Sequence, residues 1–281
     1  MKYIVAVSGG VDSVVLLDKL VRQGGRELVV AHFDHGIRPE SADDARFVEA
    51  LARSYSLPFV VKREELGGAA SEELARDRRY AFLREQAAAH GAFIVTAHHA
   101  DDVIETIAIN LLRGTGWRGV SVLDTPGIIR PQLDVTKADI YAYARDHRLE
   151  WVEDATNAGN QYLRNRMRRK ILKALTNQQR QYVVKLWRQQ VNLKRQIDVL
   201  LASYLRADAT YNRNDFIMAD WPVGRELLRA VVTARTGVSP TRPQLDRALV
   251  AVKTAQPGAA HDVGQGVRLR FSAKTFLVQT P

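Results

Sequence analysis

The chain has 281 residues, 46% of them apolar, and contains no cysteine. The length predicts two domains, since domains commonly hold about 100–200 residues. The absence of thiols excludes disulfides, cysteine-ligated zinc, iron–sulfur centres and thiol catalysis. The apolar run before Ser8 is shorter than a signal peptide or a membrane span requires, so we expect a soluble, cytoplasmic protein with no membrane partner.

Strands are predicted to alternate with helices through the first 155 residues. Short β-branched runs predict four buried parallel strands, at residues 3–7, 28–33, 59–62 and 93–96. Apolar residues at helical spacing predict helices at residues 13–22, 41–55, 71–90 and 101–112. This alternation is typical of an α/β fold with a doubly wound parallel sheet, which binds ligands beyond the carboxyl ends of its strands.

A smaller, mainly helical domain is predicted to follow. We place a linker near residues 176–180, which gives domains at 1–176 and 180–281. Apolar residues at helical spacing then predict one long amphipathic helix: Val183, Leu186, Leu193, Ile197, Leu200 and Tyr204. We expect this stripe to pack against two further helices, at residues 222–236 and 242–254, and the chain to end in a β-hairpin over residues 267–278.

One segment holds the whole excess of positive charge. Residues 160–206 contain 12 basic residues and one acid, whereas the rest of the chain contains 29 basic and 30 acidic residues. Such cations repel one another unless a polyanion neutralises them, which favours a nucleic-acid partner over a merely solvated helix face. The candidate RNA contacts are Arg164, Arg166, Arg168, Arg169, Lys185, Arg188, Lys194 and Arg195.

The motif Ser8-Gly9-Gly10-Val11-Asp12-Ser13 follows the first predicted strand and opens a helix. Two glycines permit a tight turn and a close backbone approach, and the amino end of a helix supplies unpaired N–H groups and a positive dipole. The motif therefore predicts a phosphate-binding loop, although the chain has no Walker A sequence. It resembles the PP-loop of the ATP pyrophosphatases, which cleave ATP between the α and β phosphates.

Two further polar clusters follow predicted strands, at residues 32–38 and 96–106. Together they contain four histidines and three aspartates: His32, His35, His98, His99, Asp34, Asp101 and Asp102. Such a set, taken without the glycine loop, is also typical of a metal-dependent phosphohydrolase, which is our alternative interpretation.

Taken in order, the motifs resemble those of the tRNA(isoleucine) lysidine synthetase family, over about residues 1–170. They lie at residues 8–13, 32–38, 79–80, 96–106, 112–116, 130–131, 153–157 and 164–168. The resemblance implies an adenine nucleotide alpha hydrolase-like fold and a two-step reaction on an isoleucine tRNA with a CAU anticodon. The C2 oxygen of the wobble cytidine attacks the α-phosphate of ATP, pyrophosphate leaves, and the ε-amine of free L-lysine displaces AMP to give lysidine.

This reaction suggests a role for each candidate residue. Arg113 is the cation for charge developing on the adenylyl group, with Arg38 and Lys137 as alternatives. Asp34 is the first candidate to bind lysine and accept its proton, and Asp139 the second. Asp12 is a possible Mg²⁺ ligand. The predicted ATP-binding residues are Ser8, Gly9, Gly10, Val11, Asp12, Ser13, His98, His99 and Asp102.

Three functional classes are compatible with these residues: an RNA-modifying ligase, another PP-loop enzyme acting on tRNA or on a small amide or amine, and a metal-dependent phosphohydrolase. A tRNA thiolase fits poorly, because such enzymes usually rely on cysteines. A non-catalytic RNA-binding module would not need the phosphate loop. The sequence does not decide between a monomer and a homodimer, and it does not give the number of metal ions.

Overall fold

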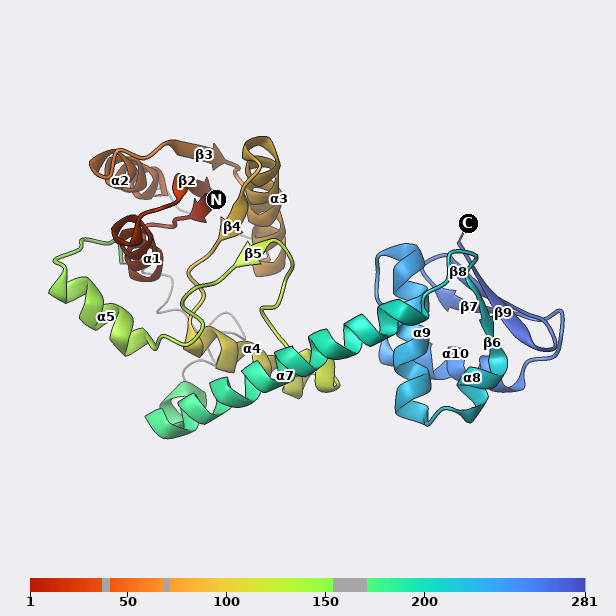
Figure 1. Ribbon diagram of the computed structural model, residues 1–281. Coiled ribbons are helices and arrows are strands. Elements are labelled where there is room, and N and C mark those ends of the chain that lie inside the picture. Colours follow the sequence, from red (N-terminus) through yellow and green to blue (C-terminus); the bar gives the residue numbers. More distant parts are fainter. Residues whose placement is uncertain (37–40, 68–70, 154–170, 281) are drawn as a thin grey trace. The chain divides into compact units, whose positions relative to one another are not determined.

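The protein divides into two compact units. The computed structural model describes residues 1–36, 41–67, 71–153 and 171–280. Unit 1 comprises Met1–Val191 and unit 2 comprises Asn192–Pro281 (Figure 1). Five basic residues with predicted roles lie outside the described residues: Arg38, Arg164, Arg166, Arg168 and Arg169.

Unit 1 is built on a five-stranded parallel sheet. Its strands are β1 (Lys2–Ala6), β2 (Glu27–Asp34), β3 (Phe59–Arg63), β4 (Phe93–Val95) and β5 (Ile128–Ile129), in the spatial order β3-β2-β1-β4-β5. The order reverses at β1, because β2 lies on one side of it and β4 on the other. Ligands bind at such reversal points in doubly wound sheets, beyond the carboxyl ends of the strands.

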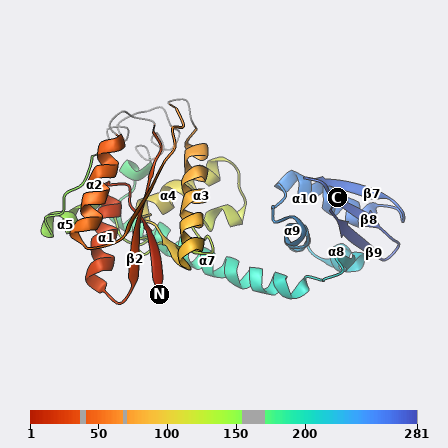
Figure 2. The ribbon, with the colours of Figure 1, turned by 90° about the horizontal axis from the view of Figure 1, so that it is seen from above.

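Helices cover both faces of this sheet, as Figure 2 shows with the sheet seen between them. One face packs against α1 (Val11–Gln23) and α2 (Ser41–Ser54), and the other against α3 (Glu72–His90). Successive strand residues point to opposite faces, so Val5 joins the core under α1 and α2 while Ile4 joins the core under α3. Both faces are therefore apolar, as the uninterrupted hydrophobic strands predict.

The strands and helices predicted for the first 112 residues are confirmed, with ends that differ by one or two residues. The fourth predicted helix is α4 (Ala100–Leu112). Three elements after it were not predicted: a 3-10 turn η1 (Trp117–Val120), strand β5 and helix α5 (Lys137–Asp146). A strand as short as β5, with two residues, leaves no periodic pattern to detect.

The long predicted helix is confirmed as α7 (Asn177–Tyr204), but its predicted apolar face is confirmed only in part: Val183 and Tyr204 pack against core clusters, whereas three leucines do not. Leu186, Leu193 and Leu200 are 44%, 47% and 70% exposed. The helix instead buries Val184, Trp187 and Val191 in a cluster with residues of α4 and the η1 region. The indole of Trp187 also donates a hydrogen bond to the carbonyl oxygen of Val122 at 2.9 Å.

The division between the units falls within α7, after Val191, rather than at the linker expected near residues 176–180. The first half of α7 belongs to unit 1 because its tryptophan and two valines pack there.

Among the described residues, no helix has the length and apolar character to cross a membrane.

Unit 2 combines helices with an antiparallel sheet. The predicted helices are confirmed as α9 (Trp221–Thr236) and α10 (Arg242–Thr254), and the predicted hairpin as β8 (Val267–Phe271) and β9 (Thr275–Gln279). The hairpin belongs to a larger, four-stranded sheet of order β6-β9-β8-β7, completed by β6 (Thr210–Asn212) and β7 (Ala260–Gly264). The short helix α8 (Arg213–Met218) contributes Phe216 to a core that includes Phe276.

A buried carboxylate of α1 ties this helix to α5 and to Tyr55, the residue that follows α2. Asp18 on α1 is 1% exposed and accepts hydrogen bonds from Arg22 Nε, from the Tyr143 hydroxyl and from the Tyr55 hydroxyl, each at 2.7 Å. Burial opposes ionisation of Asp18, but the three hydrogen bonds outweigh it, so the pKa of this carboxyl lies below its ordinary value. Burial and the hydrogen bond to Asp18 raise the pKa of Tyr143 to about 12.

We predict that Asp18→Asn lowers the free energy of unfolding by about 2–3 kcal/mol at pH 7, because an amide cannot accept all three hydrogen bonds in a buried site. The pKa of Asp18 is lowered by folding, so its contribution is complete above the unfolded pKa of about 4 and is lost as pH falls. Urea unfolding should therefore give a smaller difference between wild type and variant at about pH 3.5.

The matched control is Asp43→Asn, since Asp43 is exposed and lies in the first turn of α2. This substitution should change stability by less than about 0.5 kcal/mol. An Asp18→Asn protein as stable as the control variant at pH 7 would contradict the network's role.

Candidate functional site

The loop between β1 and α1 is held in a fixed shape by its own serines. The Ser13 hydroxyl donates to the Gly10 carbonyl at 2.8 Å and accepts from the Ser8 amide at 3.1 Å, and the Ser8 hydroxyl accepts from the Gly10 amide at 3.4 Å. Gly9 has φ +91°, a backbone conformation that residues other than glycine rarely adopt. Helix α1 begins at Val11, so the amides of Val11 and Asp12 have no acceptor within the helix, whereas those of Ser13 and Val14 donate to the Gly10 carbonyl.

Neighbouring elements support this loop from below. The Gly9 carbonyl accepts from the Val152 amide at 3.0 Å. His32 on β2 is 4% exposed, and its Nδ1 lies 2.8 Å from the Val7 carbonyl oxygen. His32 therefore supports the chain just before the loop, although the sequence grouped it with the strand-end cluster.

Asp12, in the first turn of α1, joins three motifs that are far apart in the sequence. Its Oδ1 atom lies 2.5 Å from Lys137 Nζ and 3.7 Å from His99 Nε2. His99 Nε2 in turn lies 3.5 Å from Asp102 Oδ2. The side chains of Asp12 and Lys137 are each 32% exposed, so both reach solvent at the loop.

His99 and Asp102 also build the amino end of α4. His99 is the N-cap residue, and its backbone amide donates to Asp102 Oδ2 at 2.9 Å in a capping box. Because Asp12 belongs to the first turn of α1, its approach to His99 means that two helix amino ends meet at this site. Both ends carry partial positive charge, which favours an anionic ligand.

Two histidines near this edge of the sheet are neutral at physiological pH. Burial and nearby arginines, opposed by Asp102, together lower the pKa of His98 to about 3. Burial and Arg79 lower the pKa of His35 to about 4, against Asp34. The arginines that act on His98 are Arg130, Arg79 and Arg76. Neutral imidazoles of this kind can exchange hydrogen bonds with a ligand without adding charge.

Asp34 lies at the carboxyl end of β2, where the sequence predicts a carboxylate that binds the substrate lysine. It is 4% exposed, accepts a hydrogen bond from the Gly36 amide at 2.9 Å, and its Oδ2 lies 3.6 Å from Arg63 Nη1. The carboxylate is therefore buried, and among the described residues it has Arg63 as a cationic partner.

Two other predicted residues are not gathered with the loop. Asp139 caps α5, since its Oδ2 accepts from the hydroxyl of Thr136 at 2.6 Å. Arg113 is the C-cap residue of α4 and is exposed. It lies at the opposite end of this 13-residue helix from His99, about 20 Å away along the axis. The role predicted for Arg113 therefore requires it to approach the loop from the far end of α4.

Some cations of the basic segment have acidic partners. Arg188 pairs with Asp134 of unit 1, and Lys194 Nζ lies 3.2 Å from Asp198 Oδ2. Lys185 is exposed. The predicted RNA contacts within the described part of α7 are Lys185, Arg188, Lys194 and Arg195.

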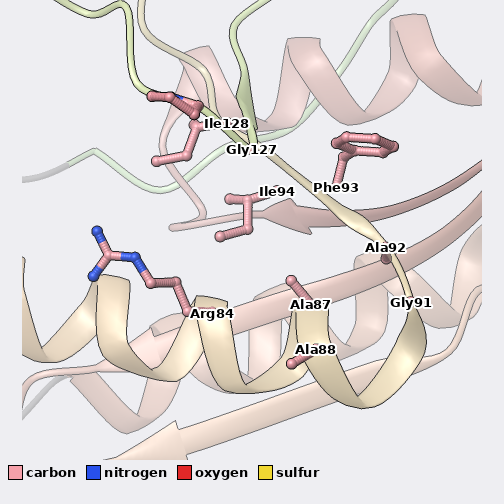
Figure 3. A pocket seen from close by; sticks show the side chains of 10 residues that line it. Arg84, Ala87, Ala88, Gly91, Ala92, Phe93, Ile94, Gly127 and Ile128 are labelled. Atoms are coloured by element: carbon pink, nitrogen blue, oxygen red, sulfur yellow. The ribbon is translucent and has the colours of Figure 1, made fainter. Parts of the chain in front are cut away.

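A shallow hollow lies at the other end of the sheet. Figure 3 shows Phe93 and Ile94 at its wall, with Ala87 and Ala88 of α3 below and Arg84 at one side. Phe93 begins β4, whereas His99 and the phosphate loop follow the strands at their carboxyl ends. The hollow is therefore separate from the candidate site.

The carboxylates and imidazoles of the site do not form a metal centre on their own. Within the described ranges, no group of three or more His, Asp or Glu side chains is placed to hold an ion. Asp102 closes a helix cap, and Asp101 Oδ1 lies 3.7 Å from Arg180 Nη1 on α7. The arrangement thus lacks the protein-only ligand set that a metal-dependent phosphohydrolase needs.

Comparison with known proteins identifies the same regions. Residues 1–175 match a family described as the PP-loop domain. Relatives named tRNA(Ile)-lysidine synthase are 42% identical over 176 residues in Solibacter usitatus, 44% over 173 in Thermus thermophilus and 33% over 272 in Pseudomonas aeruginosa. These alignments cover 61%, 59% and 92% of this chain, but only 40%, 34% and 61% of the relatives.

One solved structure shares the fold. The U34-tRNA thiolase NcsA from Methanococcus maripaludis, determined with its [4Fe-4S] cluster, superposes with a TM-score of 0.56 at 16% identity. The match covers 68% of this chain and 72% of that protein. This likeness supports the doubly wound fold.

The loop geometry predicts that replacing its two glycines by alanine lowers stability to different extents. Gly9→Ala should lower the free energy of unfolding by about 1–3 kcal/mol, because φ +91° is strained for alanine. Gly10→Ala should change it by less than about 0.5 kcal/mol, since Gly10 has φ −70° and an added Cβ would meet only Ser8 Oγ, at 3.6 Å. Equal urea-unfolding midpoints for the two variants would contradict the described loop conformation.

Proposed function

Because the chain belongs to the PP-loop domain family, we propose that it joins free lysine to C2 of the wobble cytidine of an isoleucine tRNA with a CAU anticodon. The observation that carries the ATP-dependent part is the preformed loop of residues 8–13, open at the meeting point of two helix amino ends. The choice of substrates rests on the named relatives, of which the chain spans about one third to three fifths.

In the first step, the loop amides and Ser8 and Ser13 bind the phosphates of ATP. The cytidine C2 oxygen attacks the α-phosphorus, the bond to the β-phosphate oxygen breaks, and its electron pair leaves with pyrophosphate. The neutral His98, together with His99 and Asp102, shapes the nucleotide pocket. Arg113 stabilises the charge that develops on the adenylyl group when α4 and the loop after it bring the guanidinium close.

Asp12 would hold Mg²⁺ together with phosphate oxygens of ATP, because Mg²⁺ is commonly held by one or two carboxylates and the substrate phosphates. Its single carboxylate fits that arrangement, since the rest of the coordination comes from ATP and water. When bound, the ion supplies positive charge to the phosphates. Asp12 would then release its contact with Lys137.

In the second step, Asp34 binds the lysine ε-ammonium and accepts its proton, so that the neutral amine can attack C2. A C–N bond forms, and the original C2 oxygen departs with AMP. The lysine ammonium must compete with Arg63 for Asp34. The 3.6 Å separation of Arg63 and Asp34 is long for an ion pair, which favours the ammonium. Asp139 is the second candidate, although it caps α5 in the protein without substrate.

The tRNA is held by the basic segment in this proposal. The part of α7 up to Val191 belongs to the same unit as the phosphate loop. A tRNA bound along the cations of this part can extend its anticodon toward the site. Phosphate contacts of this kind carry most of the affinity and little of the sequence information. The cytoplasmic location expected from the sequence stays a prediction.

Product analysis tests this proposal. Incubation of cytidine-bearing tRNA with ATP, lysine and the protein should release AMP and pyrophosphate, with net conversion dependent on tRNA. Mass spectrometry of the nucleosides should detect cytidine plus lysine minus water. Release of ADP and phosphate would contradict the ATP chemistry, and AMP without the lysine adduct would assign the protein to another PP-loop reaction.

The salt dependence of tRNA binding tests the α7 surface. For Lys185→Ala/Arg188→Ala, log Kd should depend less steeply on log salt by roughly 0.7–0.9 per lost phosphate contact. ATP binding should be unchanged. The control is Lys253→Ala, because Lys253 donates to the carbonyls of Ile217 and Ala219 in unit 2. A double variant with the wild-type slope would show that these side chains only solubilise the helix.

A further inference from the structure

Two arginines of α3 lie against one buried tyrosine on the same helix. Tyr80 is 5% exposed and packs with Phe33 of β2 and Ile94 of β4 in the core under α3. The guanidinium carbons of Arg76 and Arg79 lie 5.2 and 5.6 Å from the centre of the Tyr80 ring. Helix α3 ends just before β4 begins, so these residues belong to the half of the helix near the carboxyl ends of the strands.

Arg130 approaches the same face of the sheet from the end of β5. It follows two residues after Ile128, which packs in the core under α3, so the alternation of side chains along a strand places it on that side. Arg130 is 8% exposed, and its Nη1 donates to the Leu123 carbonyl at 2.7 Å. The pKa of His98 is lowered by all three arginines, which is expected if their charges gather at this edge.

Two buried donors of this cluster lack acceptors. Among the described residues, neither the Tyr80 hydroxyl nor Arg130 Nε has a hydrogen-bond partner. Leaving a buried donor unpaired costs free energy, and native proteins rarely do so without a functional reason. A guanidinium can only donate, and a tyrosine hydroxyl can donate as well as accept. An anionic acceptor would satisfy both groups.

The nearby carboxylates are engaged with other cations. Glu64 lies 3.5 Å from Arg78 Nε, and Asp34 lies 3.6 Å from Arg63 Nη1. Within the described ranges, no carboxylate lies at ion-pair distance from Arg76 or Arg130. The cluster of Arg76, Tyr80 and Arg130, which we call the arginine cluster, therefore carries uncompensated positive charge.

A carboxylate stands on the other side of a neighbouring imidazole. The His35 ring contacts the Phe33 ring, with centres 4.8 Å apart. Arg79 lowers the pKa of His35 and Asp34 raises it, so both charges act on this one side chain. A small molecule with a carboxylate at one end and an ammonium at the other would complement both charges, whereas an RNA phosphate would leave Asp34 without a new partner.

We propose that Arg76, Arg130 and the Tyr80 hydroxyl bind the α-carboxylate of free lysine. This inference rests on the proposed function and deepens it, because it assigns residues that select an α-amino acid over a simple amine. Asp34 holds the ε-ammonium at the other end of the molecule. A guanidinium matches the two oxygens of a carboxylate, and a hydrogen bond to a charged acceptor is stronger than one between neutral groups. The carboxylate forms and breaks no covalent bond, so the arginine cluster acts on affinity and orientation.

The test compares L-lysine with cadaverine, which is lysine without its carboxylate. Mass spectrometry would follow adduct formation on the tRNA by wild type, Arg76→Gln and Tyr80→Phe, with each amine varied to give kcat/KM. The ratio of kcat/KM for lysine to that for cadaverine should fall by about 10²-fold in Arg76→Gln and by about tenfold in Tyr80→Phe, since each loses hydrogen bonds that only lysine accepts.

An equal loss of activity with both amines would overturn the proposal, because the side chains would then act on ATP or on an RNA phosphate. An unchanged ratio in both variants would overturn it too. A wild type that forms no lysine adduct would overturn the proposed function and this inference with it, whereas an adduct with an unchanged ratio overturns the inference alone.

Two controls separate binding from folding. Arg78→Gln removes an exposed arginine of the same helix that pairs with Glu64, and it should keep the wild-type ratio. Tyr80→Phe removes only a hydroxyl that lacks a partner among the described residues, so urea unfolding should show no loss of stability. A fall of the ratio in this stable variant cannot then come from misfolding. Arg76→Lys keeps the charge and should restore part of the lysine preference.

Discussion

The parallel pairing of β1 with both β2 and β4 is the constraint on which the site depends. Ile4 pairs with Val29 on one side and with Ile94 on the other, so the sheet order reverses at this strand. The loops that leave β1 and β4 must then diverge, which opens a crevice between them. Helices α1 and α4 both begin at that crevice, and the 3.7 Å approach of Asp12 to His99 joins their first turns. Two positive helix ends at one place favour a ligand with several negative charges.

The charges around this crevice follow from the same geometry. Asp12 and Asp102 offset the positive charge of the two helix ends and of the Lys137 ammonium. Burial and neighbouring arginines keep His98 neutral, as its pKa of about 3 requires. A polyphosphate, which is also anionic, can therefore take the place of these carboxylates beside the helix ends. The phosphate loop itself needs no rearrangement, because Ser8 and Ser13 already hold it.

The sequence predicts those parts of the fold and site that are encoded locally. Glycine and serine within six residues identify the phosphate loop, and β-branched runs identify the buried strands. The phase of α7 could not be predicted, because the aliphatic spacing omits Trp187, the residue that binds the helix to unit 1. Likewise, charge counting along residues 160–206 could not reveal that Asp134, outside that segment, pairs with Arg188. The contact of Lys137 with Asp12 could not be predicted either, because helix α5, which carries this lysine, was not predicted.

Helix α4 connects the ligand crevice to the basic helix. Its first turn supplies His99 and Asp102 to the site, and Asp101 in the same turn lies 3.7 Å from Arg180 at the start of α7. Further along, Val103 and Ile107 of α4 pack in one cluster with Trp187 of α7. Asp101 and Asp102 are adjacent, so a shift of α7 that strained the Arg180 contact would also act on the cap of α4. The structure therefore places one helix, α4, in contact both with the first half of α7 and with the residues proposed to bind ATP.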